Sequence, residues 1–478
     1  MEGGFADFYG QTLLHPLALM VTTLLAIAVL TLARRFALVP LLISAATMPV
    51  AQRLVIAGAD FTLLRLLLLA YLARIVLRAE WKGFLWNRLD TAIVLWVVSG
   101  TAIMTLHYGT SEAFVNRLGW AYDVGLIYFS ARFVLREWGD VLVLGKSAAL
   151  LSFPIAVLFI FEWTTQYNVF HFFGGVPEFT WVRDGLVRAQ GPYAHPIIAG
   201  LFWVCLLPMI WMLRNEARTL MMLGTLGVLA VVMTTSSSTP LLSLIAALFG
   251  ASLFVVRRHR TRMWIGLIVI LLLLHFVIMK APVWHLISRV DMVAGSTGYH
   301  RFIIFDIFIN NFSDWFATGH STPRDWGWWM RDITNEFIIQ GIRGGLLTLL
   351  LFLLVFVRAF ANVGTSLSLA ADRNVGGNLN LEWRTWLVGV AIFVHVVSFW
   401  GISYFGQMNM VLYLQLAAAG AVGVGLGTSS TAERALPIQN SRRACAPTTT
   451  PKEVFETRMT SDPDSPRRDV QRPPSLKE

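Results

Sequence analysis

About thirteen apolar runs of roughly 15 to 22 residues alternate with polar loops along this chain of 478 residues. A helix of that length crosses a hydrocarbon layer of about 30 Å and satisfies its own backbone hydrogen bonds there. Charged residues make up only 14% of the chain, well below the roughly 25% of soluble domains. The pattern predicts an all-α protein, a polytopic bundle of about 12–13 transmembrane helices.

The second predicted span is the weakest. It is short and lies between Pro40 and Pro49, so we expect a partial crossing there. The predicted spans are Leu17–Ala33, Phe36–Ala51, Leu63–Leu77, Thr91–Leu106, Leu118–Leu135, Ser147–Trp163, Pro196–Leu213, Leu220–Met233, Leu241–Val256, Met263–Met279, Phe337–Val357, Thr385–Trp400 and Met410–Leu426.

Basic residues gather in alternate loops between these spans. If the spans alternate in direction, these loops all lie on one side, which their arginine and lysine content predicts to be cytoplasmic. The long segments 164–195 and 280–336 and the polar turn Thr234–Pro240 then lie on the external side. These loops account for much of the net charge of +10, so we expect no nucleic-acid partner. The basic loop residues are Arg34, Arg35, Arg78, Lys82, Arg88, Arg132, Arg136, Lys146, Arg214, Arg218 and Arg257–Arg262.

The chain divides into a predicted transmembrane domain, residues 1–427, and a tail, residues 428–478. The tail is rich in Ser, Thr, Pro, Arg and Glu without periodicity, which predicts a disordered cytoplasmic segment. Cys205 and Cys445 lie in an apolar run and in the tail, so we expect neither a disulfide framework nor a cysteine metal site. No cleavable signal peptide is expected, because the first apolar run leads directly into further spans.

The two external segments are candidates for function because connections between helices usually have about six residues. Arginine is their most informative residue type, since its planar guanidinium binds phosphate oxygens in pairs and stays charged. Each external arginine has a simpler interpretation, in which it reaches lipid headgroups or pairs with a carboxylate. For Arg188 and Arg301, which lie in organised motifs, we favour binding of an anionic substrate such as a lipid-linked diphosphate.

Five stretches occur in an order that is similar to a known family. They are "RAQGPYAHPIIAG" from Arg188, "TTSSSTPLLSLIAAL" from Thr234, "GSTGYHRFIIFDIFINNF" around Arg301, "GHS" at Gly319–Ser321, and "TNEFIIQGIRGGLLTLLLF" from Thr334. Together they resemble the O-antigen ligase and O-antigen (exopolysaccharide) polymerase family of polytopic bacterial membrane proteins. The resemblance covers roughly Glu178 to Phe356.

The resemblance implies a metal-independent, inverting glycosyltransferase in the bacterial inner membrane, with its site facing the periplasm. Its donor would be an undecaprenyl-diphosphate-linked glycan and its acceptor a second glycan, with the lipid bilayer around both. In that reading Arg188 and Arg301 bind the donor diphosphate and stabilise the charge of the leaving group. No cofactor and no metal is implied, and chain-length regulators or export proteins are candidate partners.

One position departs from the family pattern. Ligases of the family carry a histidine before the asparagine where this chain has Thr334, and threonine is no general base near neutral pH. The nearest candidates for the base are Asp332, Glu336 and His320. The departure favours a polymerase over an O-antigen ligase acting on lipid A-core, which stays the alternative. A flippase or transporter of lipid-linked oligosaccharides is the alternative of another class.

Further external residues are candidates for substrate binding: Arg183, His195, His300, Arg331 and Asn335. His195 has a structural alternative, because it lies at a helix mouth just before Pro196. Gly191 and Pro192 predict a turn that holds Arg188 at the membrane surface. Phe302, Phe305, Ile309 and Phe312 recur at helical spacing and predict an amphipathic interfacial helix. Gly341, Gly344 and Gly345 predict close packing or a bend at the start of the next span.

Overall fold

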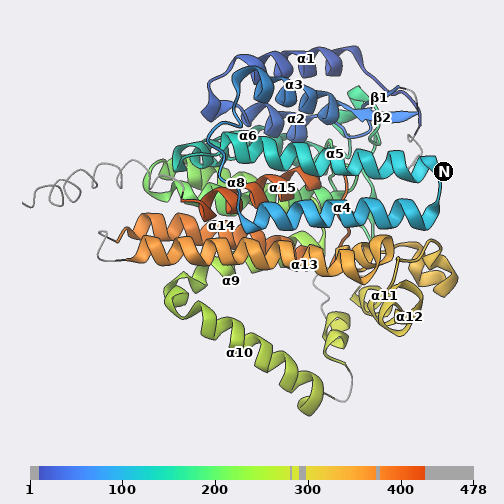
Figure 1. The fold of residues 1–478 in the computed structure, drawn as a ribbon. Helices are drawn as coiled ribbons and strands as arrows, with labels where there is room; N and C mark the ends of the chain where they lie inside the picture. The colour runs from blue at the N-terminus through green and yellow to red at the C-terminus, as the bar shows by residue number, and fades with distance from the viewer. Residues whose placement is uncertain (1–9, 57, 280–281, 290–297, 373–376, 426–478) are drawn as a thin grey trace, which may run out of the picture. The chain divides into compact units, whose positions relative to one another are not determined.

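The computed structural model describes residues 10–56, 58–279, 282–289, 298–372 and 377–425. The chain separates into two units, Met1–Ser429 and Ser430–Glu478. The predicted tail, apart from its first residues in the first unit, falls in the second unit, and all of it lies outside the described residues. The described part is almost entirely helical (Figure 1), which confirms the predicted all-α class.

The described α-helices are α1 Pro16–Thr31, α2 Val39–Thr47, α3 Leu63–Arg78, α4 Arg88–Tyr108, α5 Ser111–Val134, α6 Trp138–Thr165, α7 Pro196–Trp211, α8 Arg218–Thr234, α9 Ser238–Ser252, α10 Arg260–Leu273, α11 Gly298–Asn310, α12 Phe312–Trp315, α13 Glu336–Ala371, α14 Leu379–Ser398 and α15 Gln407–Gly423. Short 3₁₀ or π turns are η2 Arg34–Phe36, η3 Val169–Phe173, η4 Met212–Asn215, η5 Leu253–His259, η6 Leu274–Ile278, η7 Val283–Arg289, η8 Pro323–Trp326 and η9 Trp328–Arg331. Two antiparallel hairpins complete the fold, β1 Arg53–Ile56 with β2 Ala59–Thr62, and β3 Val182–Arg183 with β4 Leu186–Val187.

Every predicted span falls on one of these helices. The weak second span corresponds to α2, which has only 9 residues. By length and composition, 6 helical segments of the described chain can cross a membrane: Arg88–Tyr108, Trp138–Thr165, Pro196–Asn215, Ser238–Ile278, Glu336–Ala371 and Leu379–Ser398. The protein is therefore a membrane-embedded helical protein, and the full number of crossings stays a prediction.

The helix ends that carry the basic loops contact one another. Arg257 on η5 pairs with Glu382 in the first turn of α14. Asn215 Nδ2 donates to Asn380 Oδ1 at 3.0 Å. The other ends contact one another as well, since Gln407 Nε2 donates to Pro192 O at 3.1 Å. We call the first set the basic end and the other set, which holds the two predicted external segments, the opposite end.

Helix α10 stands away from α13 and α14 in Figure 1. None of its residues is buried, although Arg260 Nη2 near its start donates to Gly364 O at 3.0 Å. An apolar helix without protein cover is typical of a helix that faces lipid.

Glycines near the start of α13 let the external segment pack against it. Gly345 has a φ of +67° and interrupts the helical path. A Cβ atom at Gly345 would lie 2.6 Å from the Ala317 carbonyl oxygen, and one at Gly341 would lie 2.6 Å from the Phe308 ring. The predicted bend and close packing are both confirmed.

A helix is present at the predicted position as α11, and the face that packs on protein is not the face of Phe302 and Phe305. The buried residues are Gly298, Arg301, Ile304 and Phe308. Ile304 and Phe308 join a small hydrophobic core that covers α13, so contact with protein selects this face. Its other buried members are Trp315, Met330, Ile338 and Ile342. Ile309 and Phe312 are 40% and 46% exposed, and their placement in the membrane interface stays a prediction.

A buried ion pair near the basic end ties α4 to α5. Arg132 Nε lies 3.0 Å from Asp90 Oδ1, and their side chains are 2% and 0% exposed. Asp90 also accepts from the Tyr128 hydroxyl and from the Asn87 backbone N–H, both at 2.7 Å. Loss of Arg132 would leave this carboxylate buried without its cation.

We expect Arg132→Gln to lower the free energy of unfolding by about 3 to 5 kcal/mol, the cost of breaking a buried pair on one side. Thermal unfolding in detergent measures this. The control is Lys146→Gln, which removes an exposed cation. Equal unfolding temperatures for the two variants would contradict the structural role of the pair.

Candidate functional site

A tight hairpin in the first external segment fixes the position of Arg188. Strands β3 and β4 pair through Arg183 and Leu186, and the two turn residues, Asp184 and Gly185, have φ values of +53° and +77°. Two positive φ values in a two-residue loop are typical of the Asp-Gly type I′ turn. The Arg188 N–H extends the pairing by donating to Trp181 O at 3.0 Å.

A buried glutamate holds the chain immediately after Arg188. Glu162 on α6 is 2% exposed. Its carboxylate accepts from the N–H groups of Gln190 and Gly191, both at 2.9 Å, and from the Thr180 hydroxyl at 2.8 Å. Gly191 has a φ of +56°, and a Cβ atom there would lie 2.5 Å from the Phe159 ring. The predicted turn at this position is therefore present, and it requires glycine.

The Ser-rich turn between α8 and α9 receives the Arg188 side chain. The Ala189 N–H donates to Thr234 O at 3.0 Å, and the Ser236 hydroxyl donates to Val187 O at 2.9 Å. Arg188 Nη2 then donates to Ser237 Oγ at 2.8 Å. Backbone and side chain together hold this arginine on the turn.

Arg301 reaches the same turn from the second external segment. It lies on α11, is 7% exposed, and its Nη2 donates to Thr239 Oγ1 at 2.8 Å. Thr239 is two residues from Ser237, so their Cα atoms are at most about 7 Å apart. The structure thus brings together the two arginines that the sequence predicted to act together.

The electrostatics of this turn favour an anion. Burial lowers the pKa of Arg188, and Arg183 nearby lowers it further, while Asp184 opposes the shift. Arginine keeps its proton in any case, so a bound anion would stabilise a charge that its surroundings disfavour. The first N–H groups of α9, which starts at Ser238, add the positive end of a helix dipole.

His195 has a structural role beside this site. Its Nδ1 accepts from the Ile197 N–H at 3.1 Å, which makes it the N-cap of α7. Burial lowers the pKa of His195 from 6.5 to about 4, with further lowering by Arg188 and Arg183. A neutral ring with an acceptor at Nδ1 agrees with the cap, which is the alternative considered for this residue.

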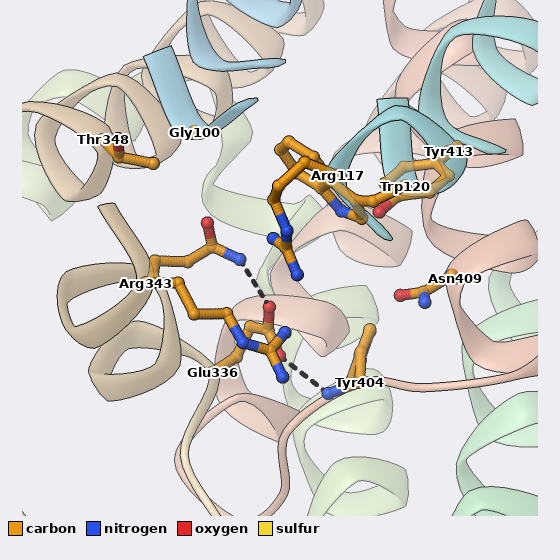
Figure 2. A pocket seen from close by; sticks show the side chains of 10 residues that line it. Gly100, Arg117, Trp120, Glu336, Arg343, Thr348, Tyr404, Asn409 and Tyr413 are labelled. Atoms are coloured by element: carbon orange, nitrogen blue, oxygen red, sulfur yellow. Dashed lines mark hydrogen bonds between the residues drawn. The ribbon is translucent and has the colours of Figure 1, made fainter. Parts of the chain in front are cut away.

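Two predicted residues, Asn335 and Glu336, lie at the start of α13. Asn335 Oδ1 accepts from the N–H groups of Phe337 and Ile338 and caps α13. Glu336 is 7% exposed, and its Oε1 and Oε2 accept from Gln340 Nε2 and from the Tyr404 N–H, both at 2.7 Å. Figure 2 shows this carboxylate in a pocket between helices.

Asp332 and Arg331 lie elsewhere, in an open cavity of about 600 Å³ that also contains Arg324 and Asp325. His300, the neighbour of Arg301, contacts Asp332 O through Nε2 at 2.9 Å. Asp332 is therefore linked through His300 to the turn of α11 that carries Arg301.

Two more predicted residues make other contacts. His320 stacks on Trp326 with ring centroids 4.5 Å apart, and its backbone N–H donates to Ile342 O at 2.8 Å. Arg183 pairs with Asp184 at 3.5 Å in the hairpin turn, where both side chains are about half exposed. The Thr334 hydroxyl is buried and has no hydrogen-bond partner within the described chain.

Sequence reasoning missed several residues that build the site. The Asp184–Gly185 pair is a recognisable hairpin signal. Glu162 lies inside an apolar run and carries no local signal for its three hydrogen bonds. The segment 399–404 was not recognised as part of the site, although Gly401 packs on Thr239 and the Tyr404 N–H donates to Glu336. This segment links the Ser-rich turn, which accepts hydrogen bonds from Arg188 and Arg301, to the pocket around Glu336.

No protein-family model matches the chain, and no curated protein matches it either. In the part of the chain that the structure describes, no group of three or more His, Cys, Asp or Glu residues could hold a metal ion. The resemblance to the O-antigen ligase and polymerase family is therefore a hypothesis that depends on the motifs.

We expect NMR titration of ring-labelled histidine to find His195 neutral down to about pH 5, because its pKa is lowered to about 4. Its pKa in the folded state lies below the value of 6.5 for a free histidine. Its contribution to stability is therefore complete above pH 6.5 and declines as the pH falls toward 4. In Arg188→Gln the pKa should rise, since one repelling charge is lost. A His195 pKa above 6 in the wild type would contradict the capping role.

Proposed function

We propose that the protein is a membrane glycosyltransferase that uses a polyprenyl-diphosphate-linked glycan as donor. The observation that carries this proposal is the convergence of Arg188 and Arg301, from two distant segments, on hydroxyl groups of one turn. Two guanidinium groups and a helix N-terminus form a compact site for a diphosphate. The lipid tail of such a donor would lie in the bilayer, beside the apolar helices.

The arginines would act on the leaving group. The acceptor hydroxyl oxygen forms a bond to C1 of the donor sugar while the bond between C1 and the diphosphate oxygen breaks. The electron pair of that bond leaves with the diphosphate, whose growing charge the two guanidinium groups stabilise. Attack from the face opposite the diphosphate inverts the configuration at C1.

Glu336 is the base that the geometry supports best for the acceptor proton. Its two oxygens each accept one N–H, which leaves further lone pairs for a hydroxyl proton. It contacts both ends of the segment 399–404, since its own N–H donates to Phe399 O at 3.0 Å. That segment packs on Thr239, the partner of Arg301. Asp332, linked to Arg301 through His300, is the second candidate, and His320 is the third.

Polymerisation is the preferred form of the reaction, because Thr334 replaces the histidine of the ligases that the motifs resemble. Transfer to lipid A-core is the alternative, and transport of lipid-linked oligosaccharides is the alternative of another class. The proposal places the opposite end in the periplasm and the basic end in the cytoplasm of a bacterial inner membrane. Chain-length regulators or export proteins are candidate partners.

We expect Arg188→Ala and Arg301→Ala each to lower the rate of transfer by about 10²- to 10³-fold, because each removes one donor to the leaving group. The assay incubates the purified protein with a short polyprenyl-diphosphate oligosaccharide and follows product length by mass spectrometry. Arg262→Ala, which changes an exposed cation at the basic end, is the control.

The products of the same assay separate the candidate functions. A ladder of lengths from one substrate indicates a polymerase, and a single product with lipid A-core indicates a ligase. If the wild type consumes no donor with either acceptor, the enzyme proposal fails, and transport into vesicles becomes the next test.

The base is tested by Glu336→Gln, Asp332→Asn and His320→Gln at saturating donor. We expect only Glu336→Gln to lower kcat by about 10²- to 10⁴-fold, the usual contribution of a general base. Binding of the donor should change little, since the proposed diphosphate site is formed by Arg188 and Arg301 and not by Glu336. A comparable loss of kcat in Asp332→Asn alone would identify Asp332, in the open cavity, as the base in place of Glu336.

A further inference from the structure

The pocket around Glu336 carries more positive charge than the proposed base requires. It lies between α4, α5, α13, α15 and the segment 399–404, and has a volume of about 50 Å³. Figure 2 shows Arg117 and Arg343 pointing into it. The residues that line it are Gly100, Arg117, Trp120, Glu336, Gln340, Arg343, Thr348, Tyr404, Asn409 and Tyr413.

Arg117 is a buried cation without a carboxylate partner in the described part of the chain. Its side chain is 7% exposed. Nη2 donates to the neutral Asn116 Oδ1 at 3.1 Å, while Nε is buried and makes no hydrogen bond within the described residues. Its electrostatic surroundings include repulsion from Arg343. Such a guanidinium would gain from an added anion.

Glu336 does not neutralise Arg117. Its Oε1 is held by Gln340 Nε2, and Gln340 Oε1 in turn accepts from Trp96 Nε1 at 2.9 Å. Its Oε2 is held by the Tyr404 N–H. These bonds fix the carboxylate on α13, and no ion pair within 4.0 Å joins it to an arginine among the described residues. Two cations and one anion thus face the pocket.

Aromatic rings and amides complete the wall. The Arg117 guanidinium lies over the Trp120 ring, 5.4 Å from its centroid, and Trp120 packs edge to face on Trp96 with centroids 5.0 Å apart. Trp120 and Tyr413 offer flat apolar surfaces, while Gln340 and Asn409 offer amides. Aromatic faces beside amides and charges suit a small acidic group such as a carboxylate.

We propose that Arg117 and Arg343 form an oxyanion-binding subsite, separate from the Arg188 and Arg301 site, that takes the carboxylate of an acidic sugar in the acceptor glycan. The identity of the ligand as an acceptor rests on the proposed function, whereas the oxyanion site rests on the pocket alone.

The test measures binding without any donor. The probes are a disaccharide that contains glucuronic acid and its neutral counterpart with glucose, studied by saturation-transfer NMR on the purified protein in detergent. We expect the acidic disaccharide to bind and the neutral one to bind at least about tenfold more weakly. Arg117→Gln should weaken the acidic probe about tenfold or more, and Arg117→Lys should restore part of the loss.

The control is Arg218→Gln, an exposed cation at the basic end. If gel filtration shows that Arg117→Gln is misfolded, Arg343→Gln carries the test, because the Arg343 side chain is exposed. Equal binding of the two disaccharides, or binding that neither arginine variant changes, would overturn the subsite.

Two further arms identify the source of the oxyanion. If inorganic phosphate displaces the acidic disaccharide, and short-chain phosphatidic acid binds more tightly and depends on Arg117, the ligand is a lipid headgroup and the acidic-sugar assignment fails. If the acidic disaccharide binds as expected but the protein transfers no glycan, the subsite stands and the proposed function fails. If transfer depends on Arg188 but binding of the acidic sugar does not depend on Arg117, the proposed function stands and the subsite fails.

Discussion

A guanidinium group in a helical membrane bundle needs an anion or several hydrogen-bond acceptors, and this need organises both ends of the protein. At the basic end, arginines such as Arg132 and Arg257 pair with carboxylates on neighbouring helices. At the opposite end, Arg188 donates to a neutral hydroxyl. Among the described residues no carboxylate lies within ion-pair distance of Arg188 or Arg117. An added anion would therefore stabilise both of these arginines.

The scaffold around these cations is specific and rigid. Glu162 on α6 fixes the backbone after Arg188, and the bend at Gly345 lets the second external segment pack against α13. The segment 399–404 contacts both Thr239 and Glu336. If the proposed function holds, the diphosphate site, the base and the acceptor subsite lie along this one connected set of contacts.

The sequence alone predicts the helical class, and every predicted span falls on a helix, because apolar runs of helical length carry that information directly. It also singles out Arg188 and Arg301, since arginines in long external segments are unusual. It does not predict which face of α11 is buried, because Ile304 and Phe308 pack on residues far along the chain. The roles of Glu162 and Arg117 are not predicted for the same reason, because tertiary contacts and not the local sequence pattern determine their surroundings.

The most direct test of the central claim is a cryo-electron microscopy structure of the protein in a lipid nanodisc with undecaprenyl diphosphate. We expect diphosphate density over the turn at Ser237–Thr239, within hydrogen-bond distance of both Arg188 and Arg301. We also expect the lipid tail to extend into the bilayer. Diphosphate density at another place, or density that only one of the two arginines reaches, would contradict the shared site.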